Sequence, residues 1–409
     1  MKKLITSVFM ILILNSSGFA QYAWTQKTSM PIARYIGCGF TIGTKSYVGT
    51  GYNSNPTALG DWWEYDQISD TWTQKASTTT RSSASAFVID GKGYVGLGAR
   101  SSTFLTDFYQ YDPVTNIWTQ KASLPAQGRF GAASFSIGNE GYVVCGNFGS
   151  ANGPYTNEVF GYNVITNTWS AKAAFPGISR YGGRGESINN LGYVFGGING
   201  SGTSSSDFFS DLWEYNPASN SWLQKTDIPG LGRQYPSVFI LNDQFVAGAG
   251  VHFTGFLSDF FSFDPVLNVW NNLPSLPSSE ARWAAVGFSN GVDGYLVSGN
   301  LSLNNPIVIT NTLWKLSNTT ALPSELVMPE DILIYPNPCT HILTIDLKNT
   351  KPDNIYLSDI NGKRVADNHR MKKVNNSIVT FNVDAFPSGI YFVNMYINGQ
   401  QMVRKVVKE

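Results

Sequence analysis

The fold is decided by the stretch Arg81-Ser-Ser-Ala-Ser-Ala-Phe-Val-Ile-Asp-Gly-Lys-Gly-Tyr-Val-Gly-Leu-Gly98 and, after a polar loop, Asp107-Phe-Tyr-Gln-Tyr-Asp-Pro-Val-Thr-Asn-Ile-Trp118. A run of small and apolar residues after Arg81 predicts a first strand, and Asp90-Gly91 favours a tight hairpin turn. The following glycine-rich segment predicts a second strand with close backbone neighbours. Residues 107–111 predict a third strand, Asp112-Pro113 a turn, and the segment around Trp118 a fourth strand. We therefore expect four short antiparallel strands within about 48 residues.

The same pattern recurs along the chain. Tryptophans of the fourth strand stand at Trp24, Trp72, Trp118, Trp169, Trp222 and Trp270. Arginines that open the first strand stand at Arg34, Arg81, Arg129, Arg180, Arg233 and Arg282. Aromatic residues of the second strand stand at Tyr47, Tyr94, Tyr142, Tyr193, Phe245 and Tyr295. Repeats of about 50 residues with four strands each predict the blades of a β-propeller, and six copies predict six blades.

These residues resemble the kelch repeat over residues 21–317. The diglycine of that repeat is complete only as Gly196-Gly197. The resemblance implies an all-β, six-bladed kelch-type propeller at residues 21–320. The kelch family includes enzymes, adhesins and adaptor scaffolds, so the fold leaves the function open.

The last repeat, from Arg282 to Leu316, lacks its own tryptophan-bearing strand. The segment Tyr22–Lys27 is such a strand with no blade before it. We therefore expect this segment to complete blade six and close the ring, which removes open strand edges.

Residues 1–20 have the features of a signal peptide. Lys2 and Lys3 precede an apolar run of eleven residues, and Gly18-Phe-Ala20 offers a cleavage site. The run is too short to span a bilayer as a resident helix, and no other stretch is long enough. We expect an exported protein with no transmembrane segment in the mature chain.

Residues 321–331 are rich in proline and acidic residues and predict a linker. Short alternating strands in residues 332–409 predict a small β-sandwich of about seven strands. The characteristic segments are Ile334-Tyr-Pro-Asn-Pro338, Asp359-Ile-Asn-Gly362, Ser388-Gly-Ile-Tyr391 and Arg404-Lys-Val-Val-Lys408. Together they resemble the C-terminal sorting domain of type IX (Por-type) secretion. The resemblance implies the type IX machinery as a partner, export through the periplasm of a Gram-negative bacterium, and a secreted or cell-surface protein.

Charge and composition narrow the function classes. Residues 21–331 hold 16 Lys and Arg against 22 Asp and Glu, and a net charge of −6 argues against nucleic acid as a partner. Cys38, Cys145 and Cys339 predict buried thiols rather than a disulfide framework. The propeller holds one histidine, His252, in a loop-like stretch, which predicts a surface or loop residue more readily than a catalytic base. The sequence points to no metal site and no cofactor.

The six register arginines have two interpretations. They could present guanidinium groups to an anionic ligand. Each of five repeats also carries a carboxylate at a fixed place, while the sixth has Thr312; the five are Asp61, Asp107, Glu158, Asp211 and Asp259. We therefore favour Arg–carboxylate pairs that knit the blades together.

The residue after the register arginine is aromatic in four repeats, as Tyr35, Phe130, Tyr181 and Trp283. At the rim of a central channel these rings could stack on sugars; they could equally belong to the core.

Blade four breaks its own pattern. Six residues after the register arginine, five repeats have phenylalanine and blade four has Glu186. Four residues after it, blade four has Arg184 where the others have a small or apolar residue. Departures from a repeat mark sites or compensated strain. Arg184 and Glu186 form either an internal ion pair or a pair that contacts a ligand.

Two functions remain. The first is a surface-displayed module that binds a glycan or a protein, with ligand contacts at Arg184, Glu186 and the four aromatic residues. The alternative is a carbohydrate-processing enzyme resembling a sialic-acid mutarotase (N-acetylneuraminate epimerase), for which Glu186 and Arg184 are the catalytic candidates. The shortage of titratable groups favours binding over catalysis.

Overall fold

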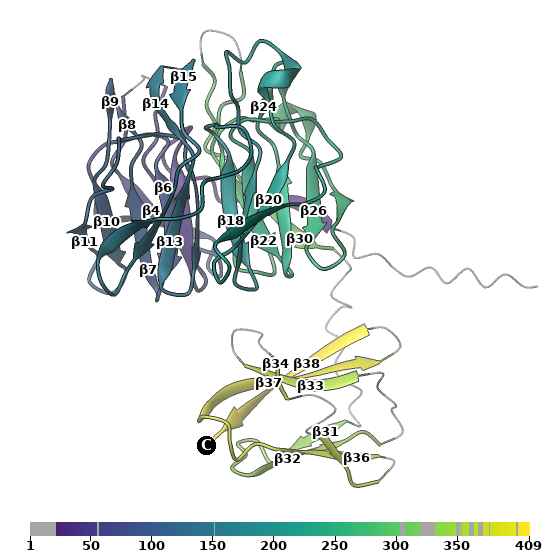
Figure 1. Cartoon of the computed structure of the whole chain (residues 1–409). Coiled ribbons are helices and arrows are strands. Elements are labelled where there is room, and N and C mark those ends of the chain that lie inside the picture. Colours follow the sequence, from purple (N-terminus) through teal and green to yellow (C-terminus); the bar gives the residue numbers. More distant parts are fainter. Residues whose placement is uncertain are drawn as a thin grey trace, which may run out of the picture. The chain divides into compact units, whose positions relative to one another are not determined.

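The computed structural model describes residues 22–54, 57–150, 152–302, 307–319, 332–348, 352, 354–359, 364–366, 371–375, 377–397 and 400–409. The chain divides into two compact units, Met1–Thr319 and Thr320–Glu409 (Figure 1). The signal peptide expected at 1–20 and the linker expected at 321–331 lie outside the described residues. No helix in the described ranges is long and apolar enough to cross a membrane.

In the described residues the first unit contains six four-stranded antiparallel sheets, one for each repeat of the sequence, and we refer to each sheet as a blade. Blade one has β2 (Cys38–Ile42), β3 (Lys45–Gly49), β4 (Trp62–Asp66) and β5 (Thr71–Lys75). Blade two has β6 (Ser85–Ile89), β7 (Lys92–Gly96), β10 (Phe108–Asp112) and β11 (Ile117–Lys121). Blade three has β12 (Ala133–Ile137), β13 (Glu140–Val144), β16 (Val159–Asn163) and β17 (Thr168–Ala171).

Blade four has β18 (Arg184–Ile188), β19 (Leu191–Phe195), β20 (Leu212–Asn216) and β21 (Ser221–Gln224). Blade five has β22 (Ser237–Leu241), β23 (Gln244–Gly248), β26 (Phe260–Asp264) and β27 (Val269–Leu273). Blade six has β28 (Val286–Ser289), β29 (Gly294–Val297), β30 (Leu313–Asn318) and, from the start of the chain, β1 (Tyr22–Lys27).

The turns form as the sequence predicts. Asp90 and Gly91 have φ of 50° and 65°, the left-handed pair that a two-residue hairpin needs. The Asp112 side chain accepts hydrogen bonds from the backbone amides of Val114 and Thr115, at 2.9 and 3.5 Å, and so fixes the turn before the fourth strand.

The first strands of the blades surround a central channel. Each first strand contacts the next one along the chain, and β28 contacts β2, so the ring is closed. The prediction for the start of the chain is confirmed, because β1 pairs antiparallel with β30 from Tyr22↔Asn318 to Lys27↔Leu313. All of this confirms the propeller.

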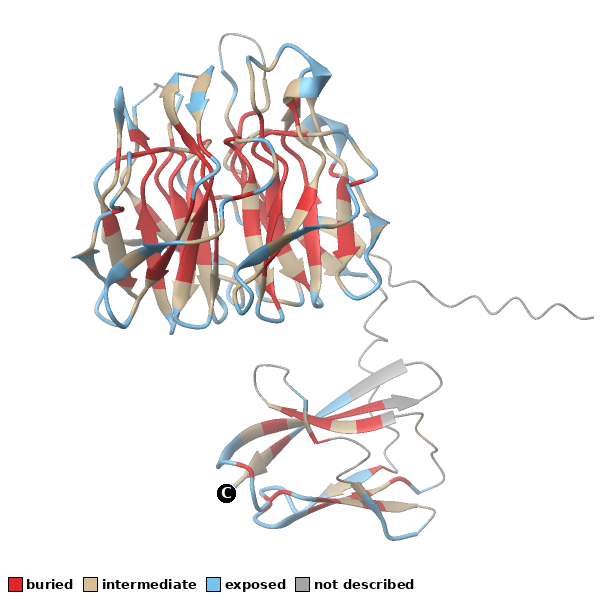
Figure 2. Ribbon diagram, in the orientation of Figure 1, coloured by how far each residue is buried: buried red, intermediate tan, exposed pale blue. Residues whose placement is uncertain are grey.

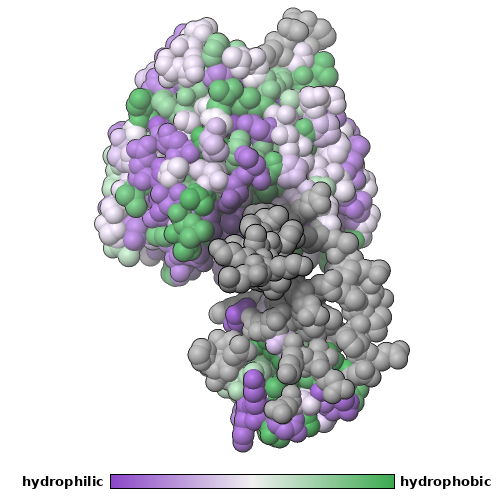
Figure 3. All heavy atoms as spheres, turned by 90° about the vertical axis from the view of Figure 1, so that its right-hand side faces the viewer, coloured by the Kyte–Doolittle hydropathy of each residue, from purple (hydrophilic) through white to green (hydrophobic). Residues whose placement is uncertain are grey.

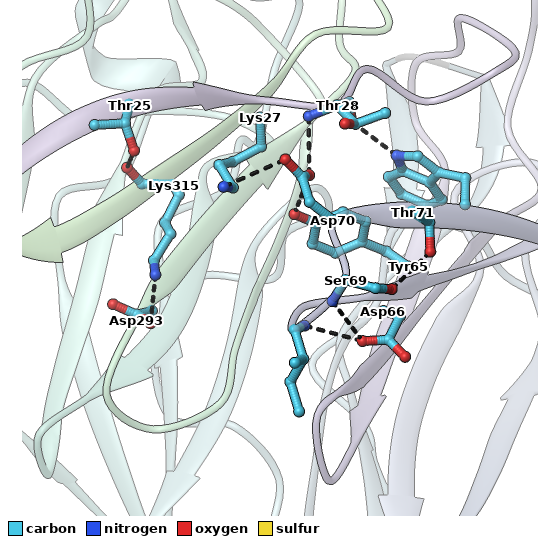
Figure 4. Close-up of polar contacts among 12 residues, drawn as sticks. Thr25, Lys27, Thr28, Tyr65, Asp66, Ser69, Asp70, Thr71, Asp293 and Lys315 are labelled. Atoms are coloured by element: carbon cyan, nitrogen blue, oxygen red, sulfur yellow. Dashed lines mark hydrogen bonds and ion pairs between the residues drawn. The ribbon is translucent and has the colours of Figure 1, made fainter.

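Polar contacts tie β1 to blade one across the closure (Figure 4). Lys27 Nζ lies 3.3 Å from Asp70 Oδ2, and the backbone amide of Thr28 donates to Asp70 Oδ1 at 3.0 Å. Trp72 Nε1 donates to the Thr28 carbonyl at 2.8 Å. β1 is therefore held in two ways: it is a strand of the blade six sheet, and the contacts of Lys27 and Thr28 with Asp70 and Trp72 connect it to blade one.

Three short hairpins rise from the ends of the second and third strands, and we call the face that carries them the upper face (Figure 1). They are β8–β9 (Ala99–Arg100 and Thr103–Phe104), β14–β15 (Asn147–Ser150 and Gly153–Tyr155) and β24–β25 (Val251–His252 and Gly255–Phe256). In blade four a short 3₁₀ helix, η1 (Ser205–Asp207), stands at the same place.

The core lies between neighbouring blades rather than at one centre. Phe40 and Trp62 of blade one pack in one cluster with Val95 and Tyr111 of blade two. Figure 2 shows this burial in the inner strands and the exposure of the turns at both ends. In the side view of Figure 3, hydrophobic and hydrophilic residues alternate over the propeller wall without a continuous apolar belt.

The second unit is a β-sandwich of two four-stranded sheets, β31-β32-β36-β35 and β34-β33-β37-β38. The first has β31 (Leu333–Tyr335), β32 (Ile342–Asp346), β35 (Met371–Lys373) and β36 (Ile378–Asn382). The second has β33 (Asn354–Asp359), β34 (Arg364–Ala366), β37 (Gly389–Ile397) and β38 (Gln400–Lys408). Leu343 and Phe381 from one sheet and Leu357 and Val393 from the other share a core. The described residues of this unit thus contain eight strands where about seven were expected.

Candidate functional site

The register arginines are the most deeply buried charged residues of the propeller, with exposed fractions of 2% or less. In four blades the guanidinium pairs with an aspartate through two parallel hydrogen bonds, as Arg34 does with Asp61 at 3.1 and 2.7 Å. Both residues of each pair belong to one blade. The arginines therefore support the blades from within and are not available to an anionic ligand.

Contact between blades comes from the arginine backbone instead of its side chain. The Arg81 carbonyl accepts from the Gly51 amide of the preceding blade at 2.8 Å, and Gly299 donates in the same way to Arg34 across the closure. The expectation that Arg–carboxylate pairs knit the blades together is thus wrong for the side chains. The carboxylate that binds each arginine side chain belongs to the same blade as the arginine. The neighbouring blade contributes a glycine backbone amide, which donates to the arginine carbonyl.

Blade six replaces the missing carboxylate from another position. Arg282 pairs with Glu280, which also accepts from Thr312 Oγ1 and Trp314 Nε1, both at 3.1 Å. In blades one and four, Trp63 and Trp213 donate to the register aspartate in the same way. Glu280 therefore occupies the place of the aspartate, although it precedes its arginine by two residues.

Around the upper mouth of the channel runs a ring of residues with left-handed backbone conformation. They follow the register arginine by two positions and are Ile36, Ser83, Gly131, Gly182, Tyr235 and Ala284. Backbone hydrogen bonds connect neighbours in this ring, for example Ser83 to Ile36 at 2.9 Å and Tyr235 to Gly182 at 2.6 Å. The ring holds one large polar side chain, that of Tyr235.

Tyr235 reaches from blade five across the channel. Its hydroxyl lies 3.0 Å from Ser83 Oγ of blade two, and a Cβ added to Gly131 of blade three would lie 2.8 Å from the same hydroxyl. Its side chain is 3% exposed. Tyr235 therefore closes the upper mouth of the channel.

Arg184 lies directly under this closure. Its guanidinium carbon is 4.8 Å from the centre of the Tyr235 ring, and Nη1 donates to the Gly183 carbonyl at 3.3 Å. Burial lowers the pKa of Arg184. In the described part of the chain no ion pair joins Arg184 to Glu186, and neither contributes to the pKa shift of the other. The expected internal ion pair is therefore corrected to a cation–π contact, because the ring of Tyr235 offers its face to the guanidinium.

The channel is narrow and mostly lined by small residues. Its upper part has a volume of about 70 Å³ and is lined by the starts of the first strands, from Gly37–Gly39 of blade one around to Ala285–Gly287 of blade six. The lower part has a volume of about 190 Å³ and carries hydroxyl groups of Thr41, Ser136 and Ser289. Both volumes are below the 300–1,000 Å³ typical of sites for small organic ligands.

Glu186 lines both parts of the channel. Its side chain is half-buried and faces the narrow channel. Burial raises the pKa of Glu186 to about 7, and a backbone hydrogen bond at Ser187 opposes that shift. Glu186 is therefore a proton-exchanging group near neutral pH.

A second departure from the repeat accompanies Glu186. In blade three the Phe135 ring fills the space above Gly192 of blade four, so that a Cβ there would lie 2.1 Å from the ring. Phe40, Phe87 and Phe239 meet glycines of the next blade in the same way. In blade four Glu186 replaces the phenylalanine, and in blade five Gln244 replaces the glycine that this ring would meet. Both members of the phenylalanine–glycine pair therefore change together. The sequence alone could have shown this second change, because Gln244 interrupts the glycines that precede the aromatic residue of the second strand in other repeats.

The four aromatic candidates lie together on the upper face but differ in exposure. Tyr35 and Tyr181 are 9% and 8% exposed and belong to the core, whereas Phe130 and Trp283 are half-buried. The ring centres of Tyr35 and Trp283 are 5.9 Å apart, and those of Phe130 and Tyr181 are 5.3 Å apart. Rings from the hairpins extend the group, since Phe104 stacks on Phe130 and Tyr155 stacks on Tyr181.

A wider cleft opens beside blade three, and sequence reasoning did not find it. It has a volume of about 650 Å³ and is formed by the segment before Arg129, the hairpin β14–β15, the start of β16 and Ser179 of blade four. Its polar lining includes Gln127, Asn157 and Glu158. Four separate chain segments form this blade three cleft. No single sequence motif could predict it, because the segments meet only in the folded protein.

His252 is buried rather than at the surface. It is 3% exposed, and its Nδ1 and Nε2 lie 2.9 Å from Thr254 Oγ1 and 3.3 Å from Ser205 Oγ. Burial, with a smaller effect of Arg233, lowers its pKa. The three cysteines are free and buried, as expected.

Comparison with protein families connects these features to known proteins. Residues 333–409 match the secretion system C-terminal sorting domain, and residues 179–227, in blade four, match the kelch motif. The chain is a kelch propeller with a C-terminal sorting domain. This domain points to export of the kelch propeller by type IX secretion, to the cell surface or the extracellular space.

The kelch propeller is also similar to curated proteins and to a solved structure. N-acetylneuraminate epimerases of Shigella sonnei (strain Ss046) and Escherichia coli (strain K12) are 35% identical over 81 residues, which is 20% of this chain. The match spans 22% of the length of those relatives. The solved structure of YjhT has a TM-score of 0.59 and 17% identity, and the alignment covers 70% of this chain and 95% of that one. At this identity the likeness supports the propeller fold alone.

Proposed function

We propose that this protein is an exported binding module whose kelch propeller holds a carbohydrate on its upper face. The observation that carries the proposal is the group of aromatic side chains around the closed channel mouth. Phe130 and Trp283 are half-buried, and each is braced by a neighbouring ring. Flat, rigid aromatic faces suit the apolar faces of sugar rings and lose little entropy on binding.

The dimensions of the channel favour this face over the channel interior. The upper part holds about 70 Å³, enough for about two waters, and Tyr235 lies across its mouth. A sugar therefore meets the aromatic surface before it can reach Glu186.

In this proposal the sorting domain delivers the propeller to its place of action. The signal peptide at 1–20 takes the chain into the periplasm of a Gram-negative cell, and residues 332–409 engage the type IX machinery. The propeller then meets its ligand at the cell surface or in the medium.

A glycan array probed with the mature protein tests the proposal. We expect selective binding, and we expect Trp283→Ala to weaken it at least tenfold in a variant that still melts cooperatively well above the assay temperature. Leu223→Ala is the matched control, because Leu223 is an exposed apolar residue of β21 on the outer edge of blade four. A wild-type protein that binds no glycan, or a Trp283→Ala variant that binds as wild type does, would refute the proposal.

A second candidate function is sugar mutarotation, supported by the N-acetylneuraminate epimerases among the relatives and by the pKa of Glu186 of about 7. A carboxyl group with such a pKa can both donate and accept a proton near neutral pH. The test is the rate of anomer exchange of N-acetylneuraminate, followed by NMR with wild type and Glu186→Gln. Acceleration by wild type that Glu186→Gln abolishes would favour the enzyme over the binding module.

A further inference from the structure

We propose that the blade three cleft binds an uncharged sugar, with the Glu158 carboxylate as the acceptor for its hydroxyl groups. This inference rests on the proposed carbohydrate-binding function and adds a site and a ligand class to it. The cleft volume of about 650 Å³ is in the range of sites that hold small organic ligands.

The carboxylate of blade three departs from the repeat. Asp107 and Asp259 use both carboxylate oxygens on their arginine, with bonds between 2.7 and 3.0 Å. Glu158 is one methylene longer and uses only Oε2, which accepts from Arg129 Nη2 at 2.7 Å. Oε1 of Glu158 has no hydrogen-bond partner within the described ranges and remains available to a ligand.

Exposure supports this difference between the blades. The Glu158 side chain is 52% exposed, against 14–33% for the four register aspartates. The arginine is affected too, because Arg129 Nη1 is buried without a partner among the described residues. In other blades the same atom donates to the carbonyl 16 residues further on, as Arg81 does to Leu97. In the Arg129–Glu158 pair of blade three, the arginine and the carboxylate thus each keep one polar atom without a partner among the described residues.

Aromatic residues form the walls of the cleft. Phe148 and Phe160 are half-buried, and the Arg129 guanidinium carbon lies 5.6 Å from the Phe160 ring centre. Tyr155 stacks on Tyr181, with 5.6 Å between ring centres, and so connects the cleft to the aromatic surface at the channel mouth. Aromatic walls with a few polar groups suit a ligand that has apolar faces and a hydroxylated edge.

The charge of the lining selects the ligand class. Glu158 is the one carboxylate among the lining residues, and none of them is Lys or Arg. The nearby cation, Arg129, is fully buried and pairs with Glu158, so it presents no free positive charge to an acidic ligand in the cleft. The other polar groups, such as the amides of Gln127 and Asn157, are neutral. A like charge opposite a carboxylate is costly, so acidic sugars are rejected and neutral ones accepted. The ligand class is therefore a neutral hexose or N-acetylhexosamine oligosaccharide, in contrast to the acidic sugar named in the relatives.

The test is titration calorimetry of the mature protein with neutral oligosaccharides (gluco-, galacto- and chito-oligosaccharides) and with N-acetylneuraminate. The informative variant is Glu158→Asp, which restores the aspartate of four other blades and withdraws the free oxygen from the cleft. We expect its melting temperature to equal or exceed that of wild type while the Kd for the neutral sugar rises at least tenfold. Phe148→Ala should weaken the same ligand by a similar factor.

The matched control is Asp259→Asn, which disturbs an Arg–carboxylate pair in blade five, away from the cleft. It should lower the melting temperature and leave the Kd unchanged. Neutral-sugar binding that survives both Glu158→Asp and Phe148→Ala would overturn the cleft assignment and leave the carbohydrate-binding function standing. Preference for N-acetylneuraminate would overturn the ligand class, and no binding to any sugar would overturn both proposals.

Discussion

At the scale of single residues, the exceptions to the repeat gather in and above the channel. Glu186 replaces a phenylalanine, Arg184 a small or apolar residue, and Tyr235 stands where its sister positions have no aromatic ring. The Arg184 guanidinium packs against the Tyr235 ring from below, and the Tyr235 hydroxyl reaches Ser83 on the far side of the channel. Two of these departures, Arg184 and Tyr235, thus build the closure of the channel mouth. The third, Glu186, lies below it without a charged partner in the described ranges.

The pKa of Glu186 predicts a pH-dependent stability. The folded-state pKa of about 7 is above the ordinary value of 4.5, so the folded protein binds this proton more tightly than the unfolded chain does. The stability associated with the proton is complete below about pH 4.5 and is lost as the pH rises through 7. Glu186→Gln removes this loss. We expect the variant to gain stability over wild type between pH 5 and 8, by at most about 3 kcal/mol.

Thermal melts of both proteins across this pH range measure the effect. Ser187→Ala, a neutral change at the next position, is the control and should follow wild type at every pH. Cys38 and Arg184 are the other titratable residues of the upper channel, and both are present in the variant and in wild type, so their titration is common to the two proteins. A difference between Glu186→Gln and wild type that stays constant with pH would show that Glu186 is already solvated in the folded state.

At the scale of elements, the fourth strand of each blade is held by its tryptophan. Trp118 Nε1 donates to the Ala76 carbonyl just after the fourth strand of the preceding blade, at 2.8 Å. Trp24 of β1 donates in the same way to the Pro274 carbonyl after β27, also at 2.8 Å, and its ring centre lies 4.8 Å from that of Phe260. The strand from the start of the chain is thus bound like the five internal ones.

This equivalence predicts the effect of Trp24→Ala. The change removes a half-buried ring and a hydrogen bond at the closure, and we expect a loss of about 3 kcal/mol in the free energy of unfolding. Trp118→Ala is the matched change inside the ring and should cost a similar amount. Chemical denaturation of both variants makes the comparison. A Trp24→Ala variant as stable as wild type beside a weakened Trp118→Ala would show that closure does not depend on β1.

At the scale of the whole molecule, each unit has its own core. The sandwich core draws its residues from Ile332 to Val406, and the propeller clusters draw theirs from residues before Thr319. Independent cores permit independent folding, so we expect the export function of the sorting domain to be separable from the proposed binding function of the propeller.

Removal of residues 332–409 therefore has a divided outcome. We expect the truncated protein to keep the melting temperature and the glycan binding of the propeller, because no propeller core residue is lost. In its native host it should accumulate in the periplasm, which fractionation followed by immunoblotting measures. Normal amounts of truncated protein on the cell surface or in the medium would contradict the role of the sorting domain.

The sequence by itself determined the blades, the closing strand and the sorting domain. Each depends on residues that recur at a fixed spacing or follow one another in a short motif, as Arg81, Asp90-Gly91 and Trp118 do. A strand pattern and its turns are local properties, and six copies of one pattern reinforce each other. The sequence also singled out Arg184 and Glu186, because the other five repeats define which residues are expected at these two positions.

Only the tertiary structure decided which groups meet. Arg184 is two residues from Glu186, yet its guanidinium contacts the ring of Tyr235, because the propeller places the start of blade five beside the start of blade four at the channel mouth. Arg282 takes Glu280 because the spatial place of a carboxylate can be filled from another point of the chain. The blade three cleft likewise combines segments from Pro125 to Ser179. Contacts between segments far apart depend on backbone curvature and side-chain length, and the repeat pattern records neither.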